Sequence, residues 1–165
     1  MNKAFIKKVS VKPLRAYLHQ PFTTALGTHN SLDNILLTIE LNDGTKGFGE
    51  AAIASHITGE TVEETKKNLK DLKKNLIGKS ILNYLRISFD LHARLSKNKS
   101  AIAAVETALL DALTRQNKIP LWKFFGNRCA ILQTDITVSC GINGIAFGLK
   151  QILIKFTQEL VIFDY

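Results

Sequence analysis

Two alternating apolar runs joined by an Asp-Gly pair constrain the fold of this chain more than any other feature. The first run, NILLTIEL, covers residues 34–41, and the second, TKGFGEA, covers residues 45–51. Alternation with period two is typical of a half-buried strand, and the intervening Asn42-Asp43-Gly44 favours a tight β-hairpin. We therefore expect two antiparallel strands here, preceded by a third strand-like segment over residues 3–18 that Pro13 interrupts.

Residues 20–30 are polar and rich in turn-forming side chains, and we expect a loop there. Helical periodicity begins further on. Thr61, with Glu64 three residues later, has the form of a capping box, and Gly78 is placed to end the helix that follows.

Two more helices are expected after Gly78. The pattern over about residues 82–95 places Leu85, Phe89 and Leu91 near one face. The alanine-rich stretch 101–113 carries apolar residues at spacings of three and four, with Ser100 as its expected N-cap. Its many alanines permit close packing against neighbouring elements.

The pattern changes again after Gly126. Residues 134–140 alternate like a strand, residues 152–156 fit another, and a short helix fits 145–150. Strand, helix, strand is the opening of a parallel α/β arrangement. The whole chain is therefore expected to be an α+β domain, a three-stranded antiparallel meander followed by helices, joined to the beginning of a second domain.

The net charge of +8 raises the question of a nucleic-acid partner. The densest group of lysines, five of the seventeen, falls within residues 63–74, between apolar residues at helical spacing. This pattern is typical of the solvated face of an amphipathic helix. Because no aromatic residues interleave with these lysines to stack on bases, we do not expect nucleic-acid binding.

Composition and the lengths of the apolar runs argue against a disordered, membrane-spanning or secreted protein. Hydrophobic residues make up 45% of the chain, enough to bury a core. Its longest apolar runs, such as 35–37 and 152–154, fall far short of a membrane span, and the N-terminus lacks a signal-peptide pattern. A cytoplasmic location without membrane contact is expected. Cys129 and Cys140 have no metal-ligand spacing and are expected to be buried thiols.

Five motifs in order resemble one known family. PFTTALGT (21–28), GFGEA (47–51) and ITGET (57–61) resemble the N-terminal capping domain of the enolase superfamily. The similarity is greatest to its muconate-lactonizing subgroup and, within it, to dipeptide epimerases of the Ala-Glu type. SAIAAVETALLD (100–111), with IPL (119–121) and FG (125–126), is similar to the helix and exit loop that lead into the family's barrel, and TDITVS (134–139) resembles its first barrel strand.

The resemblance implies a capping domain over residues 1–126 and the start of an incomplete TIM barrel over residues 127–165. It also implies a magnesium ion, held by barrel carboxylates, that stabilises the enolate formed when a base removes the proton next to a carboxylate. Two lysines on opposite sides of the barrel exchange the roles of acid and base in these epimerases. The resemblance therefore implies that an intact member of the family is an isomerase acting on a dipeptide.

Lys155 is the candidate catalytic residue that the resemblance offers. It lies in LIK (153–155), where the family has a Lys-x-Lys motif, and Leu153 replaces the first lysine. The metal carboxylates and the opposing lysine would lie beyond Tyr165. We therefore expect no metal ligand in this chain and no catalysis by it alone. A natural early stop, a frameshift near Gly141 and the way the chain was delimited all fit this pattern.

The capping domain of the family contributes substrate contacts rather than chemistry. By resemblance, one substrate-contact loop spans about residues 22–29 and a second contains Ile57. A basic residue of the first loop can bind the acidic side chain of the substrate, and the matching position here is Gly27, which predicts a different dipeptide preference. The substrate-binding residues implied in this way are Phe22, Ala25, Gly27, Thr28, Ile57 and Thr58.

Other titratable residues are expected to be structural or solvated. His29 and His56 flank the two loops and fit ordinary surface histidines. Glu50 at a strand end and Asp111 on the alanine-rich helix fit structural carboxylates, because no second group supports catalysis. Asp135 is a single carboxylate without partners, a weak signal for a metal ligand.

Two other functions stay open at the level of sequence. The chain could be a non-catalytic binding or assembly module derived from the capping domain, since helix faces without a barrel would leave apolar surface exposed. It could also belong to a relative resembling muconate cycloisomerase. Self-association into a homo-oligomer and the identity of the dipeptide are not decided by the sequence.

Overall fold

The computed structural model describes residues 4–24 and 27–126. The chain divides into two compact units, Met1–Phe125 and Gly126–Tyr165. The strands and helix expected within residues 134–156 therefore lie outside the described residues. Cys129, Asp135, Cys140 and Lys155 lie outside them too.

The first unit contains the expected three-stranded antiparallel meander. Strand β1 (Ile6–Thr24) pairs with β2 (Gly27–Leu41), and β2 pairs with β3 (Lys46–Ala51), in the order β1-β2-β3. The predicted hairpin joins β2 to β3. In its turn the Asp43 carboxylate accepts the N–H of Thr45 at 2.9 Å, and Gly44 adopts a positive φ of 88°. The Asp-Gly pair therefore forms the hairpin turn that the sequence predicted.

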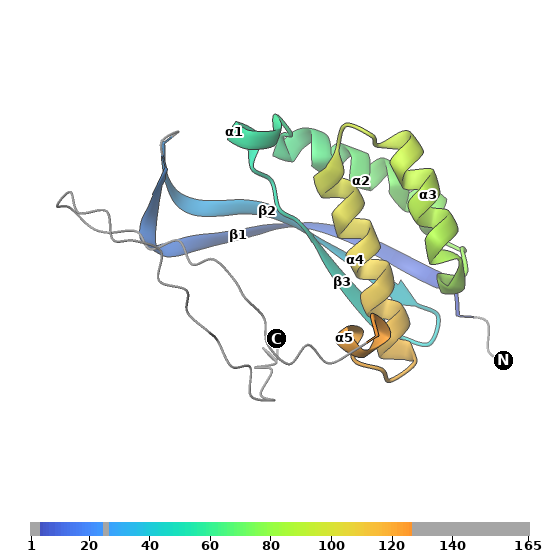
Figure 1. Cartoon of the computed structure of the whole chain (residues 1–165). Helices are drawn as coiled ribbons and strands as arrows, with labels where there is room; N and C mark the ends of the chain where they lie inside the picture. Colours follow the sequence, from blue (N-terminus) through green and yellow to red (C-terminus); the bar gives the residue numbers. More distant parts are fainter. Residues whose placement is uncertain (1–3, 25–26, 127–165) are drawn as a thin grey trace. The chain divides into compact units, whose positions relative to one another are not determined.

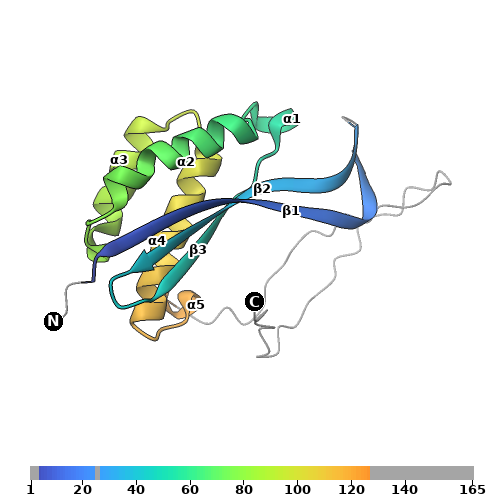
Figure 2. The same ribbon diagram turned by 180° about the vertical axis from the view of Figure 1, so that it is seen from behind.

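Helices follow the sheet and cover one of its faces. Figures 1 and 2, seen from opposite sides, place α4 against β3 and show no helix of residues 4–126 on the other face of the sheet. No helix among the described residues is long and apolar enough to cross a membrane. The helices are α1 (Ser55–Thr58), α2 (Val62–Leu76), the 3-10 turn η1 (Ile81–Asn83), α3 (Tyr84–Arg94), α4 (Lys99–Gln116) and α5 (Leu121–Phe124).

The core lies between the inner face of the sheet and the helices. Alternate residues of β2 point into it, as period-two patterning requires. Helix α2 buries its apolar stripe and leaves its lysines exposed or half-buried, which confirms the amphipathic interpretation of residues 63–74. The buried members of the core include Ile35, Leu37, Ile39 and Leu41 of β2, Leu69, Leu72 and Leu76 of α2, and Ile102, Val105, Leu109 and Leu113 of α4.

Two glycines of β3 allow α4 to approach the sheet at backbone distance. A Cβ atom at Gly49 would lie 1.9 Å from the carbonyl oxygen of Ala104, and one at Gly47 would lie 2.2 Å from that of Ala108. No side chain fits at such distances, so glycine is required on the strand and a small residue on the helix. The alanine-rich pattern predicted close packing, and the structure shows that its partner is β3.

The hairpin of β1 and β2 is longer than the sequence predicted. Pro13 does not interrupt β1, because β1 is an edge strand in which a missing N–H removes no bond from the ladder. The loop expected over residues 20–30 was wrong as well. The strands continue to Thr24 and from Gly27, and they pair there. Cross-strand pairing has overridden the turn-forming composition of this segment.

The structure tests three predictions about where the helices begin and end. The Thr61 hydroxyl accepts the N–H of Glu64 at 3.2 Å, which confirms the N-terminal half of the capping box. Gly78, with φ 84°, follows the last residue of α2 by two positions, close to the predicted end. Ser100 is not the N-cap of α4, because the helix begins at Lys99, two residues before the predicted start, and Asn98 occupies the N-cap position.

The buried face of α3 was assigned wrongly in part. Leu85 and Phe89 are 70% and 69% exposed, whereas Ile87 and Leu91 are buried. Both pairs have i, i+4 spacing, so periodicity alone allowed either face. Contact with α4 selects the face that carries Ile87 and Leu91.

The Gly49→Ala substitution tests the backbone contact between β3 and α4. It is expected to lower the free energy of unfolding of the 165-residue chain by about 1–3 kcal/mol or to abolish cooperative unfolding, because the new methyl group meets backbone rather than a movable side chain. Urea denaturation measures the change. Thr107→Ala, on the exposed side of α4, is the control and is expected to shift stability by less than about 0.5 kcal/mol. Equal shifts for the two variants would contradict the role of Gly49.

Asp43 gives the fold a predictable dependence on pH. The backbone N–H of Thr45 holds the pKa of this carboxyl below its ordinary value, and the side chains of Thr45 and Gln116 act in the same direction. A pKa depressed in the folded state stabilises the fold above the unfolded-state pKa, about 3.9, and this contribution is lost as the pH falls through the folded value. The stability lost in Asp43→Ala should therefore be larger at pH 7 than in acid. Urea midpoints at both pH values measure it, and an equal loss at the two pH values would contradict this role of Asp43.

Candidate functional site

One side of the candidate site is the far end of the β1–β2 hairpin. There Thr23 pairs with Thr28 and Thr24 with Gly27, and the two threonine hydroxyl oxygens lie 3.1 Å apart. The register of the two strands shifts between Tyr17 and Phe22, which sets this end apart from the regular ladder. Gly27 adopts a φ of 144°.

The structure fully describes four of the six predicted substrate-binding residues. Gly27 and Thr28 begin β2, and Ile57 and Thr58 end α1. Phe22 pairs with His29 through the backbone of β1. Ala25 lies outside the described residues.

The other side of the candidate site is α1 and the turn after it. Ile57 points largely to solvent and is 73% exposed. The Thr58 hydroxyl donates to the carbonyl oxygen of Ala54 and accepts the N–H of Glu60, each at 3.3 Å. Gly59, with φ 74°, ends the short helix in the left-handed conformation that glycine adopts without strain.

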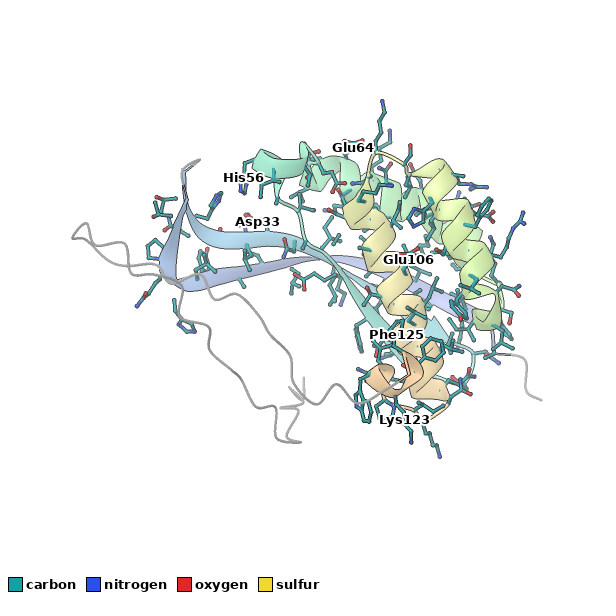
Figure 3. The ribbon with its side chains drawn as sticks, in the orientation of Figure 1. Asp33, His56, Glu64, Glu106, Lys123 and Phe125 are labelled. Carbon is teal, nitrogen blue, oxygen red and sulfur yellow. The ribbon has the colours of Figure 1, made fainter. Side chains whose placement is uncertain are left out.

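His29 and His56 bring these two sides together. Their imidazole rings lie 4.6 Å apart between centroids and are inclined by 30°. Figure 3 shows His56 on α1, on the side toward the far end of the hairpin. The sequence predicted two surface histidines, and the structure has His56 exposed and His29 half-buried. Their contact was not predicted, and it forms because strand pairing carries β2 far enough to reach α1. The Nε2 atom of His29 is shielded from solvent and has no hydrogen-bond partner within the described part of the chain.

Asn34 anchors the segment that leads from β3 to α1. Its amide nitrogen donates to Glu50 at 2.5 Å, and its carbonyl oxygen accepts the N–H of Ile53 at 3.1 Å. Glu50 therefore has the structural role that the sequence predicted. Sequence reasoning missed Asn34, although a polar residue at the start of the buried run 34–41 is a signal that could have identified it.

Glu60 anchors the same segment at its other end. This carboxylate is only 5% exposed and accepts the backbone N–H groups of Lys99 and Ser100, the first residues of α4. The Ser100 hydroxyl also contacts Glu60 and donates to the carbonyl oxygen of Ala52 at 3.0 Å. A carboxylate from a distant loop thus caps α4, where its charge meets the positive end of the helix dipole.

Asp111 is likewise a structural carboxylate, as predicted. It accepts the backbone N–H of Phe48, on β3, at 2.9 Å and the Nε–H of Arg115 at 2.8 Å. It thereby satisfies a donor on the open edge of β3.

One cation of the β1–β2 hairpin has a carboxylate partner. Arg15 of β1 forms an ion pair with Asp33 of β2, and the hydrogen bond between them raises the pKa of the guanidinium. Within residues 4–24 and 27–126, no group of three or more His, Cys, Asp or Glu side chains could hold a metal ion. The described residues therefore do not fit a magnesium site.

The sequence comparisons identify relatives of this arrangement. Residues 6–126 match the family described as "Mandelate racemase / muconate lactonizing enzyme, N-terminal domain". The hydrophobic dipeptide epimerase of Citrifermentans bemidjiense is 39% identical over 133 residues, which cover 78% of this chain and 36% of the relative. The aromatic dipeptide epimerase of Herpetosiphon aurantiacus is 31% identical over 168 residues, which cover 96% of this chain and 47% of the relative.

Solved structures agree with the sequence comparisons. A mandelate racemase/muconate lactonizing protein from H. aurantiacus superposes with a TM-score of 0.76 at 33% identity, covering 83% of this chain and 38% of that one. A dipeptide epimerase from Enterococcus faecalis, in complex with Mg and L-Leu-L-Tyr, superposes with a TM-score of 0.76 at 30% identity over 83% and 39% of the two chains. The predicted capping-domain fold is confirmed, and the chain spans less than half the length of these relatives.

The Glu60→Gln substitution tests the cap on α4. It removes the charge at the helix N-terminus and leaves one acceptor for two N–H groups, so we expect the free energy of unfolding to fall by about 1–2 kcal/mol. Urea denaturation of the 165-residue chain measures the fall. Glu63→Gln, exposed in the first turn of α2, is the matched control, with an expected loss of about 0.3–0.5 kcal/mol. A loss no larger for Glu60→Gln than for the control would refute the capping role.

Proposed function

Since the chain belongs to the mandelate racemase/muconate lactonizing enzyme family through the N-terminal domain at residues 6–126, we propose that it is the capping part of a magnesium-dependent dipeptide epimerase. One observation carries this proposal. The two segments that the family resemblance assigns to substrate contact are far apart in sequence, yet His29 and His56 place them side by side. Relatives named as dipeptide epimerases support the reaction class.

The proposal divides the work between two regions of the chain. Residues 1–126 form the capping domain, whose hairpin end and α1 cover the substrate and exclude water from it. Residues 127–165 begin the barrel, where Lys155 is the candidate base. Magnesium accompanies the dipeptide in the E. faecalis structure, whereas the described residues of this chain do not fit a metal site. We therefore propose that the 165-residue chain is inactive by itself.

A dipeptide with uncharged, apolar side chains fits this capping domain best. The position where Ala-Glu epimerases carry a basic residue is Gly27, which has no side chain to bind a carboxylate. Arg15, a cation on the same hairpin, is already paired with Asp33. Ile57 presents an exposed apolar surface on the other side of the site. The names of the C. bemidjiense and H. aurantiacus relatives, hydrophobic and aromatic dipeptide epimerases, support this preference.

The proposed substrate-binding residues have different roles in such a site. By the family resemblance, Phe22, Ala25 and Gly27 contact the substrate from the first loop. Thr28 adds a hydroxyl that is already engaged with Thr23, so it restricts the shape of the wall more than it supplies a free donor. From the other side, Ile57 and Thr58 complete the wall.

A second candidate function is a binding or assembly module. Leu85 and Phe89 are exposed on α3, and Tyr84, Leu85 and Phe125 line a groove between α3, α4 and α5. Exposed apolar side chains next to an apolar groove are typical of interaction surfaces. This function requires no contribution to a barrel enzyme, which separates it from the first.

A chimeric enzyme tests the proposed function. Residues 1–126 would replace the N-terminal domain of the C. bemidjiense hydrophobic dipeptide epimerase, and loss of the dipeptide α-proton signal would be followed by NMR in deuterium oxide with magnesium. A misplaced capping domain lowers the rate about 100-fold, and we expect the chimera to lose less than that relative to the parent enzyme in exchanging the α-proton of L-Leu-L-Tyr. We also expect it to prefer L-Leu-L-Tyr to L-Ala-L-Glu.

The parent enzyme and the 165-residue chain are the controls for this experiment. The chain by itself is expected to give no exchange above buffer, and exchange by it would overturn the proposed inactivity. A folded chimera without exchange would argue against a capping role and favour the binding module.

A further inference from the structure

The stacked histidines lie at the joint between the two sides of the candidate site. His29 follows Thr28 directly, and His56 precedes Ile57 directly, so the ring contact lies next to a proposed substrate-binding residue on each side. The ring planes are tilted by 30° at a centroid separation of 4.6 Å, so the two imidazoles are in aromatic contact.

The end of the hairpin needs such a support. The described hairpin end, residues 22–24 and 27–29, lies beyond the register shift that separates it from the regular β1–β2 ladder. Of the residues that flank it, Tyr17, His19 and Gln20 are exposed and so contribute little to the core. Figure 1 shows this end of β1 and β2 extending away from α2, α3 and α4, with α1 as the nearest helix. The position of the hairpin end therefore depends on contacts with α1.

The contact between the two histidines has one favourable and one unfavourable contribution to its free energy. Stacking two rings is favourable, whereas shielding the His29 Nε2 atom, which has no hydrogen-bond partner among residues 4–24 and 27–126, is unfavourable. The two free energies are of the same order. If the rings separated, water could solvate that nitrogen. Such a contact holds the hairpin end in position, yet the free energy needed to separate the two rings stays small.

We propose that His29 and His56 are a pair of positioning residues that holds the hairpin end against α1 and so fixes the spacing between Thr28 and Ile57. The role of this spacing in recognising the substrate rests on the proposed function. The positioning itself requires neither dipeptide nor magnesium, so it can be tested on the 165-residue chain as it is.

Backbone hydrogen exchange, followed by NMR at residues 22–24 and 27–29, measures the positioning. His56→Ala removes the ring from an exposed position, so global stability should not change. We expect exchange at these amides to rise by a factor of about 3 to 10, the range that one aromatic pair controls. His56→Phe keeps an aromatic face without ring nitrogens and is expected to restore slow exchange. His19→Ala, at an exposed histidine of β1, is the control and should leave exchange as in the native chain.

The ring resonances of His29 give a second readout. They should move in His56→Ala, because the stacked ring no longer shields them, and stay in place in His19→Ala. The proposal is overturned if His56→Ala leaves both exchange and the His29 resonances unchanged, or if His56→Phe fails to slow exchange. None of these outcomes depends on epimerase activity, so this inference and the proposed function can fail separately.

Discussion

The close contact between β3 and α4 determines where everything else in the described structure lies. Gly47 and Gly49 remove the side chains that would keep the helix away, and the carbonyl groups of Ala104 and Ala108 occupy that space. Backbone-to-backbone contact leaves little freedom to slide, because neither side can adjust through a rotamer. Helix α4 is thereby fixed on the sheet in one register, and its N-terminus points at the segment between β3 and α2.

The backbone N–H groups at the N-terminus of α4 fix one end of the segment that carries α1. The first N–H groups of a helix need acceptors, and Glu60 supplies them from the turn after α1. Asn34 holds the beginning of the same segment against β2. With both ends fixed, α1 presents His56 to the hairpin end. The candidate site is therefore built outward from the core through hydrogen bonds made by buried polar groups, and it ends in a ring contact at the periphery.

Much of this fold could be predicted from local signals. The Asp-Gly hairpin, the capping threonine at Thr61 and the alanine-rich helix all depend on neighbouring residues, and each was found as expected. The errors concern choices between equivalent local patterns. Leu85 with Phe89 and Ile87 with Leu91 have the same spacing, and only the position of α4 decides which pair is buried. Residues 20–30 resemble a loop by composition, yet each strand supplies the other with hydrogen-bond partners.

By itself, the sequence determined the family and the meander, because short motifs and periodic patterns encode those features. The tertiary structure alone decided that Glu60 caps α4, that Asn34 anchors the loop and that His29 meets His56. These three contacts join residues separated by 19 to 39 positions along the chain. No local pattern encodes such pairs, because they come together only after the glycines of β3 have admitted α4 to the sheet.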